Sequence, residues 1–361
     1  MAFATIDVTK GITGVLPTAN ATYTSLRPNA QPLIINGDMS IAQRSTSVSS
    51  LTSSGAVQTV DRIKNEIGSI GTYTVAQESL SSGNAYNNGF RKAWRIDTTT
   101  ADASPAAGDS LYVTYHFEGQ DLQLFKKGTS NAEKVTLRFW VKSSKTGTHI
   151  VELLDNDNSR FVSLAYTISS ADTWENHTLT FPADTTGAFA DDNGVGLGIH
   201  WYMAAGDTYT SGTLGTTWNT TQANRAVGQV NLAGSVDNNW YLTGVQLEVG
   251  STATPFEHRS PAEEQQLCFR YTRKFTSHTF GRARDGDSFY AGNVVFQPPM
   301  RGTPTLKSGA DFSVSTGSGG SPTINTGQGA SGESLIISNG SANWTTNAFA
   351  RLTDAVFEAE L

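Results

Sequence analysis

The sequence of 361 residues predicts an all-β protein, and three observations carry this prediction. Apolar and polar residues alternate with period two in many segments, which is the pattern of a half-buried strand. Glycine is abundant (35 residues) and charged residues are sparse (16%), which favours short strands and turns over long helices. Turn signals recur about every 8–12 residues, as is typical of a β-sandwich or jelly roll. A parallel β-helix is disfavoured because no short internal repeat occurs.

Residues 1–32 stand apart from the predicted strands. They contain three prolines and too few large apolar side chains for a core of their own. Their apolar residues Ile6, Val8, Ile12, Val15 and Leu16 are unusual for a simple linker. We therefore expect this extended segment to dock on another protein that supplies the missing burial. The alternative is a flexible terminus.

The region 33–258 is expected to form a jelly-roll β-sandwich of about ten strands. It opens with an apolar run at Leu33 and an Asn36-Gly37 turn, and a hairpin is expected around Asp155-Asn156-Asp157-Asn158. The strand candidates in chain order are 59–67, 72–77, 92–96, 110–119, 134–144, 148–155, 160–168, 174–181, 194–203 and 240–250.

The stretch 238–267 joins this sandwich to a second domain. A strand with alternating apolar residues is interrupted at Gly244, as by a bulge. Ser260 then suits the cap of a helix, Pro261 its first position and Glu263 the capping box. We predict a linking helix over 259–274, with Cys268, the single cysteine, as a small buried hydrophobe.

Residues 275–361 are expected to form a small β-sandwich. The strand candidates are 278–282, 289–296, 304–306, 311–316, 334–338 and 355–361, and the Gly/Ser-rich stretch 315–332 is predicted to be a mobile loop. The short core of this domain favours support from oligomerisation.

Charge and motifs exclude several classes of function. The net charge of −7 argues against a nucleic-acid binder, and the short basic clusters at Lys126-Lys127 and 270–274 are expected on the solvated surface. No apolar run approaches the roughly 20 residues of a membrane span, and the N-terminus lacks the pattern of a secretory signal. The six histidines show no pairing for zinc, so we expect no metal and no cofactor.

No catalytic motif is recognisable. The glycines at 194, 196 and 198 alternate inside an apolar strand, and the acidic pairs Asp191-Asp192 and Glu263-Glu264 are typical of solvated surface. Such pairs could serve a glycosidase only if they were held about 5–10 Å apart across a sugar. We therefore expect a protein without enzymatic activity.

Aromatic side chains are the candidates for binding a sugar, because an exposed ring covers the C–H face of a pyranose. Tyr209 and Trp218 lie in a polar loop at 204–229, and Trp201 and Tyr202 lie on the strand that leads into it, so one of these two should face outward. Alternatively, Trp218 folds back onto the edge of the sandwich. The tryptophans expected in the core are Trp94, Trp140, Trp174 and Trp240, whereas the place of Trp344 is left open.

Several blocks of the sequence together resemble phage and prophage tail-fibre proteins. The blocks are LIINGDMSIAQR (33–44), VDRIK (60–64), FEGQDLQLFKKGTSNAEKVTLRFWVKSS (117–144), WENHTLTFPADTTG (174–187), VQLEVGSTATPFEHRSPAEEQQLCFRY (245–271), FQPPMRGTPTL (296–306) and the ending FEAEL. The resemblance implies a virion structural protein, a homotrimer, and a jelly roll similar to carbohydrate-binding modules. Residues 1–32 would then anchor the chain to another virion protein.

Carbohydrate-binding modules of this kind often hold a calcium ion where the two ends of the domain meet. Their turn corresponds here to Asn36-Gly37-Asp38, but Ser40 stands at the place of a glutamate. Thr243-Gly244 likewise stands at the place of an aspartate. With Asp38 as the one remaining acid, the chain departs from the calcium pattern.

The sequence and its resemblance together predict a tail fibre or spike, located on the virion surface and made in the host cytoplasm. It would attach the phage to its host through a cell-surface glycan or protein, without nucleic-acid binding or membrane insertion. One alternative is a capsid-mounted fibre or decoration protein. A second alternative is a depolymerase that cuts surface polysaccharide.

Overall fold

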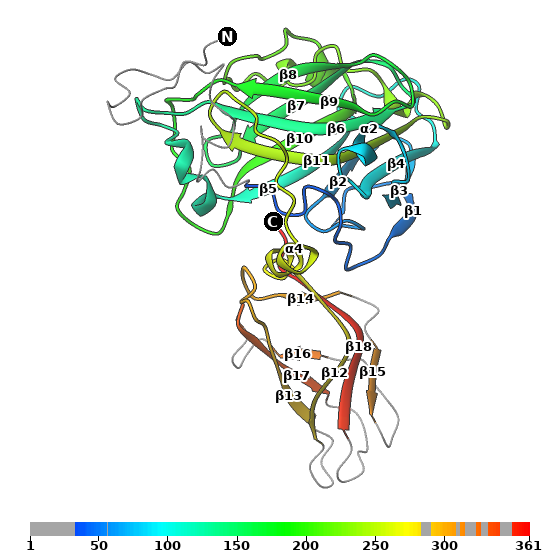
Figure 1. Ribbon diagram of the computed structural model, residues 1–361, viewed down its shortest axis with the longest axis vertical. Helices are drawn as coiled ribbons and strands as arrows, with labels where there is room; N and C mark the ends of the chain where they lie inside the picture. Colours follow the sequence, from blue (N-terminus) through cyan, green and yellow to red (C-terminus); the bar gives the residue numbers. More distant parts are fainter. Residues whose placement is uncertain are drawn as a thin grey trace, which may run out of the picture.

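The structure is a computed structural model that describes residues 33–55, 57–282, 290–307, 311–314, 323–325, 331–339 and 349–361. It confirms the all-β class: two β units follow each other along the long axis, with a helix between them (Figure 1). The expected docking residues Ile6, Val8, Ile12, Val15 and Leu16 lie outside the described residues, as does Trp344.

The larger unit is a sandwich of two antiparallel sheets. The first sheet has the order β1-β3-β4-β11-β6-β9, namely Ser47–Leu51, Thr72–Ser79, Lys92–Thr100, Asn239–Val249, Val135–Ser143 and Glu175–Phe181. The second has the order β2-β5-β10-β7-β8, namely Lys64–Gly68, Ser110–Glu118, Val195–Ala205, Gly147–Asp155 and Arg160–Ile168.

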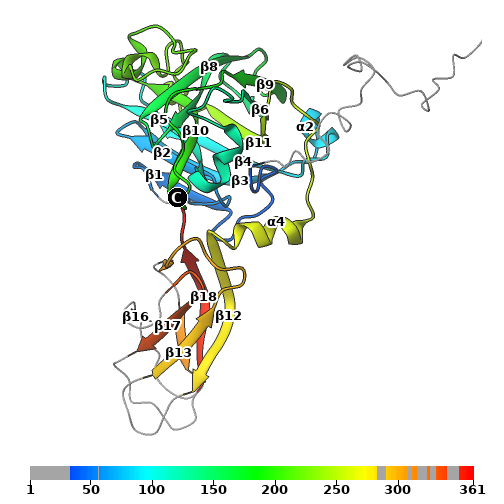
Figure 2. The same ribbon diagram turned by 90° about the vertical axis from the view of Figure 1, so that its left-hand side faces the viewer.

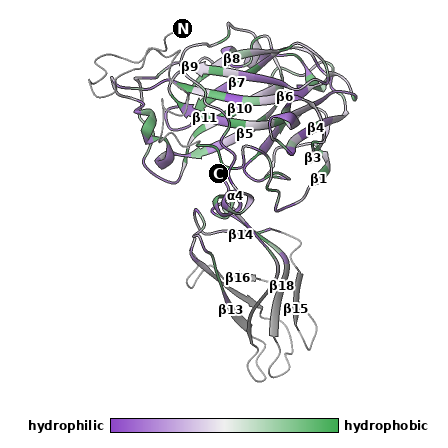
Figure 3. Ribbon diagram, in the orientation of Figure 1, coloured by the Kyte–Doolittle hydropathy of each residue, from purple (hydrophilic) through white to green (hydrophobic). Residues whose placement is uncertain are grey.

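The core lies between these sheets and is formed by the alternate residues that the sequence marks as apolar. Figure 3 shows hydrophobic and hydrophilic colours alternating along the strands. On β10, Leu197, Ile199, Trp201 and Met203 all face inward and are fully buried. Burying each such side chain contributes about 1.5–3 kcal/mol, so this seam stabilises the sandwich strongly.

Three of the four tryptophans expected in the core are buried. Trp94 and Trp240 meet edge to face with ring centroids 6.2 Å apart, and Trp174 is also buried. Trp140 is half-buried and packs outside the sandwich with Phe90.

The predicted hairpin is confirmed, because β7 and β8 pair in register on either side of the turn at 156–159. The strand expected over 59–67 is wrong in its first half, since β2 begins only at Lys64. Asp61 and Arg62 instead form a turn in which Arg62 takes a positive φ of 73°. The reason is that both side chains are buried in ion pairs and cannot alternate with a core.

Gly244 makes the predicted bulge in β11. The register with β6 shifts between Thr243 and Gln246, and Gly244 has a φ of +61°. A Cβ atom here would lie 2.6 Å from the ring of Phe90 and 2.8 Å from that of Trp140, so both conformation and space require glycine.

Short helices lie in the loops of the sandwich: α2 (Gly83–Asn87), η3 (Gly119–Phe125), α3 (Asp207–Thr210), η4 (Gln222–Asn224) and η5 (Leu232–Gly234).

Helix α4 (Pro261–Cys268) begins where the capping residues place it. The Ser260 hydroxyl accepts a hydrogen bond from the Glu263 amide at 3.2 Å. Cys268 is fully buried, as expected, and burial raises the pKa of its thiol. The helix ends before β12, which starts at Thr272 rather than at the expected 278.

The smaller unit contains two further sheets. One has the order β12-β18-β14, with β15 also paired to β18, and the other has the order β13-β17-β16. Their bounds are Thr272–Arg282, Phe349–Glu358, Thr305–Leu306, Asp311–Val314, Tyr290–Val295, Ser334–Asn339 and Thr323–Asn325, in that order. Strand β16 lies within the stretch predicted as a loop, so that prediction is wrong at 323–325.

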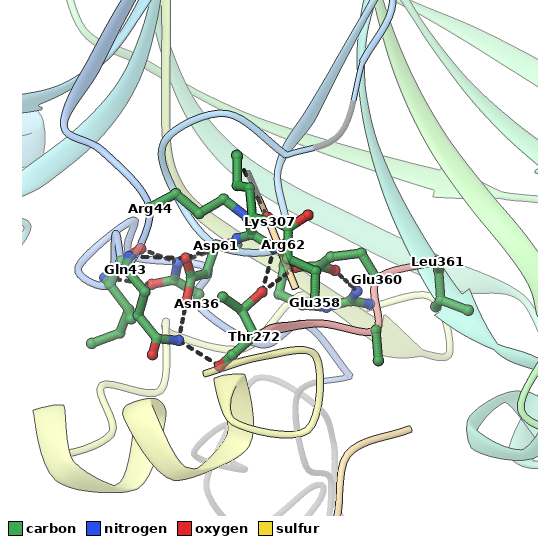
Figure 4. A network of polar contacts seen from close by, with 12 residues as sticks. Asn36, Gln43, Arg44, Asp61, Arg62, Thr272, Lys307, Glu358, Glu360 and Leu361 are labelled. Atoms are coloured by element: carbon green, nitrogen blue, oxygen red, sulfur yellow. Dashed lines mark hydrogen bonds and ion pairs between the residues drawn. The ribbon is translucent and has the colours of Figure 1, made fainter. Parts of the chain in front are cut away.

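A buried group of charges ties the two units together (Figure 4). In this junction cluster Arg44 bonds Asp61 at 3.1 Å, Glu358 at 2.5 Å and Glu360 at 2.9 Å, and Arg62 bonds Glu360 at 2.7 Å. The arginines come from the sandwich and the glutamates from the end of the smaller unit. Glu118 adds a bidentate contact with Arg270, both at 2.6 Å.

Candidate ligand-binding face

The outer face of the five-stranded sheet carries a row of polar side chains. Strand register aligns Lys64 with Thr114, Thr114 with His200, His200 with Glu152 and Glu152 with Ser163, so these residues cross all five strands in one line. A neighbouring line contains His116, Gly198, Leu154 and Phe161. We call these two lines the polar face.

Glu152 organises the centre of the polar face. Its carboxylate is fully buried and accepts two hydrogen bonds from Arg225, at 2.5 and 2.8 Å, while His200 Nδ1 lies 3.0 Å away. Burial alone would raise the pKa of Glu152, but the hydrogen bonds from Arg225 and His200 outweigh it and hold the pKa below its ordinary value. The group is therefore a carboxylate at neutral pH, with its arginine 15% exposed.

Two aromatic groups and a glycine shape the surface beside this carboxylate. Tyr112 stacks on His200 with ring centroids 4.6 Å apart, and it is only half-buried. Gly198 lets the two histidines approach, since a Cβ atom there would lie 2.9 Å from His200 and 3.2 Å from His116. Burial, together with His200, lowers the pKa of His116 to about 3, so this imidazole is neutral.

Two hydroxyls on the polar face have no hydrogen-bond partner among the residues that the structure describes. They belong to Thr114 and Ser163, and both are buried. Buried polar atoms are nearly always paired, so each unpaired hydroxyl requires an explanation. A ligand or water that reaches the face would satisfy them.

The loop at 206–230 covers one side of this sheet. The structure therefore corrects the prediction that Trp201 or Tyr202 offers an outward ring to a sugar. Alternation does place them on opposite faces, but both are buried. Trp201 lies in the core between the sheets, whereas Tyr202 faces outward and is covered by Ala226, Tyr209 and Leu214. Neither ring can therefore stack on a sugar, because the loop folds back over the strand that leads into it.

The other two aromatic residues predicted to bind a sugar, Trp218 and Tyr209, lie in different surroundings. Trp218 is half-buried against the main core and donates from Nε1 to the Pro182 carbonyl at 2.8 Å, so it folds back onto the sandwich edge. Tyr209 remains half-buried beside the polar face, with its ring 5.8 Å from the Arg225 guanidinium. Of the four residues, Tyr209 is thus the one that the structure leaves near the face with part of its surface exposed.

A cavity of about 290 Å³ adjoins the polar face. It lies between the β7–β8 turn and the loop, and its lining includes Leu154, Asn156, Phe161, Thr220, Gln222 and Arg225. Two apolar side chains thus lie beside amides, hydroxyls and charged groups, and such polar groups are the partners that ligand hydroxyls need. We call it the first cavity.

A buried lysine fixes the turn beside the first cavity. Lys127 Nζ contacts Asp155 at 2.5 Å and Asp184 at 3.1 Å, and it donates to the carbonyls of Thr186 and Gly187 at 2.8 and 2.7 Å. The expectation that Lys127 lies on the solvated surface is wrong. Its ammonium is buried because it neutralises the two aspartates that hold this end of the sandwich.

The place that corresponds to the calcium of carbohydrate-binding modules is closed by protein groups. Thr243 Oγ1 donates to the Lys92 carbonyl at 2.8 Å, and the Gly37 carbonyl accepts from the Val245 amide at 2.9 Å. Asp38 accepts from the Ser40 amide at 3.2 Å. These residues do not fit a calcium ion, which needs several hard oxygens with free lone pairs.

The acidic pairs that the sequence offers a hydrolase lie away from the polar face. Asp191 and Asp192 are exposed in a loop, and Glu263 is exposed at the start of α4. Glu264 is buried and paired with Arg259 at 3.3 Å. Across the described ranges, three or more His, Cys, Asp or Glu side chains never gather as a metal centre would require. In the same ranges, every helix is too short or too polar to cross a membrane.

No model of a known protein family matches the chain, and no curated protein matches it by sequence. Solved structures with a similar fold include the enzymatically active domain of tailspike protein 4 of bacteriophage CBA120, at 13% identity and a TM-score of 0.32. That match covers 60% of this chain but only 21% of the tailspike chain.

Two further matches are sugar-related proteins. A putative sugar binding protein of Bacteroides thetaiotaomicron is 14% identical with a TM-score of 0.31, covering 61% of this chain and 100% of the other. A family 11 carbohydrate-binding module of Clostridium thermocellum, in complex with a β-1,3-1,4-mixed-linked tetrasaccharide, is 9% identical with a TM-score of 0.28 and covers 58% and 98%. Scores this low say nothing of what this chain binds.

Sequence reasoning missed Glu152, His200, Arg225 and Tyr112. Part of the signal was present, because the apolar phase of β10 leaves Gly198, His200 and Tyr202 on the opposite face. What the sequence lacked was the order of the strands, which brings Glu152 and Tyr112 beside His200, and the path of the loop that delivers Arg225.

Proposed function

We propose that this protein binds a cell-surface glycan on the polar face and acts as the host-attachment fibre or spike of a phage virion. The observation that supports glycan binding is the Arg225–Glu152 pair, whose arginine is partly exposed beside Tyr112 and the first cavity. Planar charged groups bond adjacent sugar hydroxyls, and a half-buried ring covers a C–H face.

The role on a virion rests on the resemblance of the sequence blocks to tail-fibre proteins. Residues 33–44, 60–64 and 245–271 belong to these blocks, and their side chains build the junction between the two units.

Glycan binding is tested with an array of bacterial O-antigens, capsular polysaccharides and their fragments, probed with the purified full chain. A positive glycan is then measured against the double variant Asn156→Ala/Gln222→Ala, which removes two exposed amides of the first cavity. We expect roughly tenfold weaker binding, since each lost hydrogen bond contributes about 0.5–1.5 kcal/mol.

Gln266→Ala is the matched control, because Gln266 is an exposed amide on α4, away from the face. Equal binding by the double variant and the control would show that the first cavity is not part of the binding site. If the array shows no glycan at all, the proposed function is wrong.

The virion role is tested by electron cryo-microscopy of the phage that encodes the chain. Density for the two-unit shape on the tail supports the proposal. Density on a capsid vertex would instead identify a capsid-mounted fibre or decoration protein.

A further inference from the structure

A second cavity lies at the opposite end of the polar face, where the two units meet. It has a volume of about 410 Å³, and its lining includes Val57, Lys64, Arg301, Thr303, Thr305 and Leu361. The first two of these residues come from the sandwich and the other four from the smaller unit. Figure 2 shows the chain end at the lower edge of the sandwich, directly above the smaller unit.

The polar face connects this second cavity to the first, and its accessible surface between them is that of the half-buried Tyr112 and His116, because Thr114, His200 and Glu152 are themselves buried. Lys64 both lines the second cavity and begins the line of residues that ends at Glu152 and Ser163. His116 Nδ1 lies 3.3 Å from the Leu361 carbonyl oxygen, and its own line continues through Gly198 to Leu154 in the first cavity.

The separation of the cavities sets the size of the molecule that would use both. Strands β2 and β7 are three positions apart in the sheet, which corresponds to roughly 14 Å at the usual spacing of strands. A monosaccharide cannot reach across this distance, whereas a chain of several sugar units can.

The charged groups along the second cavity, which also include Glu358 and Glu360, are already engaged within the protein. Lys64 pairs with Glu66 at 2.6 Å, and Arg301 donates to the carbonyls of Asn193, Ala359 and Glu360 at 2.7, 2.8 and 3.0 Å. In the first cavity, Asp155 is paired with Lys127 and Arg225 with Glu152. An acidic sugar would find no cation among these residues that is not already engaged, so the lining favours hydroxyl groups over carboxylates.

We infer that the polar face takes a neutral oligosaccharide of several units that runs from the first cavity to the second, so that the smaller unit supplies one end of the binding site. This inference rests on the proposed glycan binding. It assigns the smaller unit a direct part in recognition and makes the junction part of the site.

The test uses the full chain and size-graded fragments of a neutral O-polysaccharide and of an acidic capsular polysaccharide, with affinities from isothermal titration calorimetry. Thr303→Trp places a bulky ring in the second cavity at an exposed position. We expect the unmodified protein to bind long neutral fragments at least roughly tenfold more tightly than mono- and disaccharides. Thr303→Trp should abolish that advantage while leaving the short fragments unaffected.

The matched control is Thr178→Trp, an exposed threonine on β9 of the other sheet. Short and long fragments binding equally, a preference for the acidic fragments, or an undiminished length advantage in Thr303→Trp would each overturn the inference and leave glycan binding intact. Failure of every fragment to bind would overturn both proposals.

Discussion

The junction cluster and the polar face are built from the same chemistry, buried carboxylates held by arginines, yet they differ in what surrounds them. At the junction the side chains of Arg44 and Arg62 are 1% and 2% exposed. On the polar face Arg225 is 15% exposed and opens onto a cavity. The arginines of the junction cluster are sealed by the protein, and its exposed edge is that of Glu358 and Glu360, which are 14% and 11% exposed and line the second cavity. On the polar face it is the arginine that keeps an edge that a ligand can reach.

The contrast shows how a structural ion pair is distinguished from a recognition site. At the junction Glu360 is shared by two arginines that precede it by about 300 residues, so the charges join distant parts of the chain. On the face Glu152 joins one strand to its neighbour and to a loop, the half-buried Tyr112 stacks on His200, and two buried hydroxyls have no partner among the described residues. Variants can separate these two roles.

The largest effect is expected at the junction. Glu360→Ala leaves Arg44 and Arg62 buried without their shared partner, and breaking such a pair costs about 3–5 kcal/mol. Urea denaturation of the full chain measures the loss in the free energy of unfolding. Glu333→Ala, at an exposed glutamate of the same unit, is the control and should change little. A loss no greater than in the control would show that the cluster does not hold the units together.

A smaller loss is expected on the polar face. Arg225→Met leaves Glu152 buried with His200 alone, which should cost about 2–3 kcal/mol at pH 7. Because burial then acts on the carboxyl without its arginine, the pKa of Glu152 should rise in the variant. A raised pKa means that stability is recovered as the pH falls, so the deficit should be smaller at pH 5 than at pH 7. A deficit that is independent of pH would contradict this account.

His116 touches both regions and should make stability depend on pH. Its pKa in the folded protein is about 3, below the value of 6.5 expected when unfolded, so the unfolded chain takes up the proton first. Stability from this group is complete above pH 6.5 and falls as the pH drops toward 3. His116→Phe should reduce the loss between pH 7 and pH 5.5 by about 1 kcal/mol. If the free energy of unfolding depends on pH equally in the variant and the parent, His116 is not the cause of the dependence.

The smallest effect is expected for an ion pair that is neither sealed nor part of a site. Lys126 and Glu133 lie 2.8 Å apart with side chains 52% and 39% exposed. Lys126→Met should change the free energy of unfolding by at most about 0.5 kcal/mol, because solvent screens such pairs. A thermal melt of this variant sets the baseline for the two buried clusters, and a loss comparable with that of Glu360→Ala would show that exposure does not decide their strength.

The sequence by itself determined the class of the fold, most of the strands and the local devices between them. Alternation identified β5, β6, β10 and β11, the Asp155–Asn158 turn predicted the hairpin, and Ser260 marked the start of α4. These features depend on residues close together in the chain, and period two or a capping side chain expresses them directly. The bulge at Gly244 belongs to the same group.

Only the tertiary structure decided which side chains form the polar face and which charges are buried. Tyr202 follows the predicted alternation but is covered by a loop, and Lys127 is buried because Asp155 at the end of β7 and Asp184 in the loop after β9 neutralise it. Arg225 reaches Glu152 across 73 positions, and Arg44 reaches Glu360 across 316. Such contacts depend on strand order and loop path, which hydrophobic periodicity does not encode, because it records which face of a strand is apolar and not which strand lies beside it.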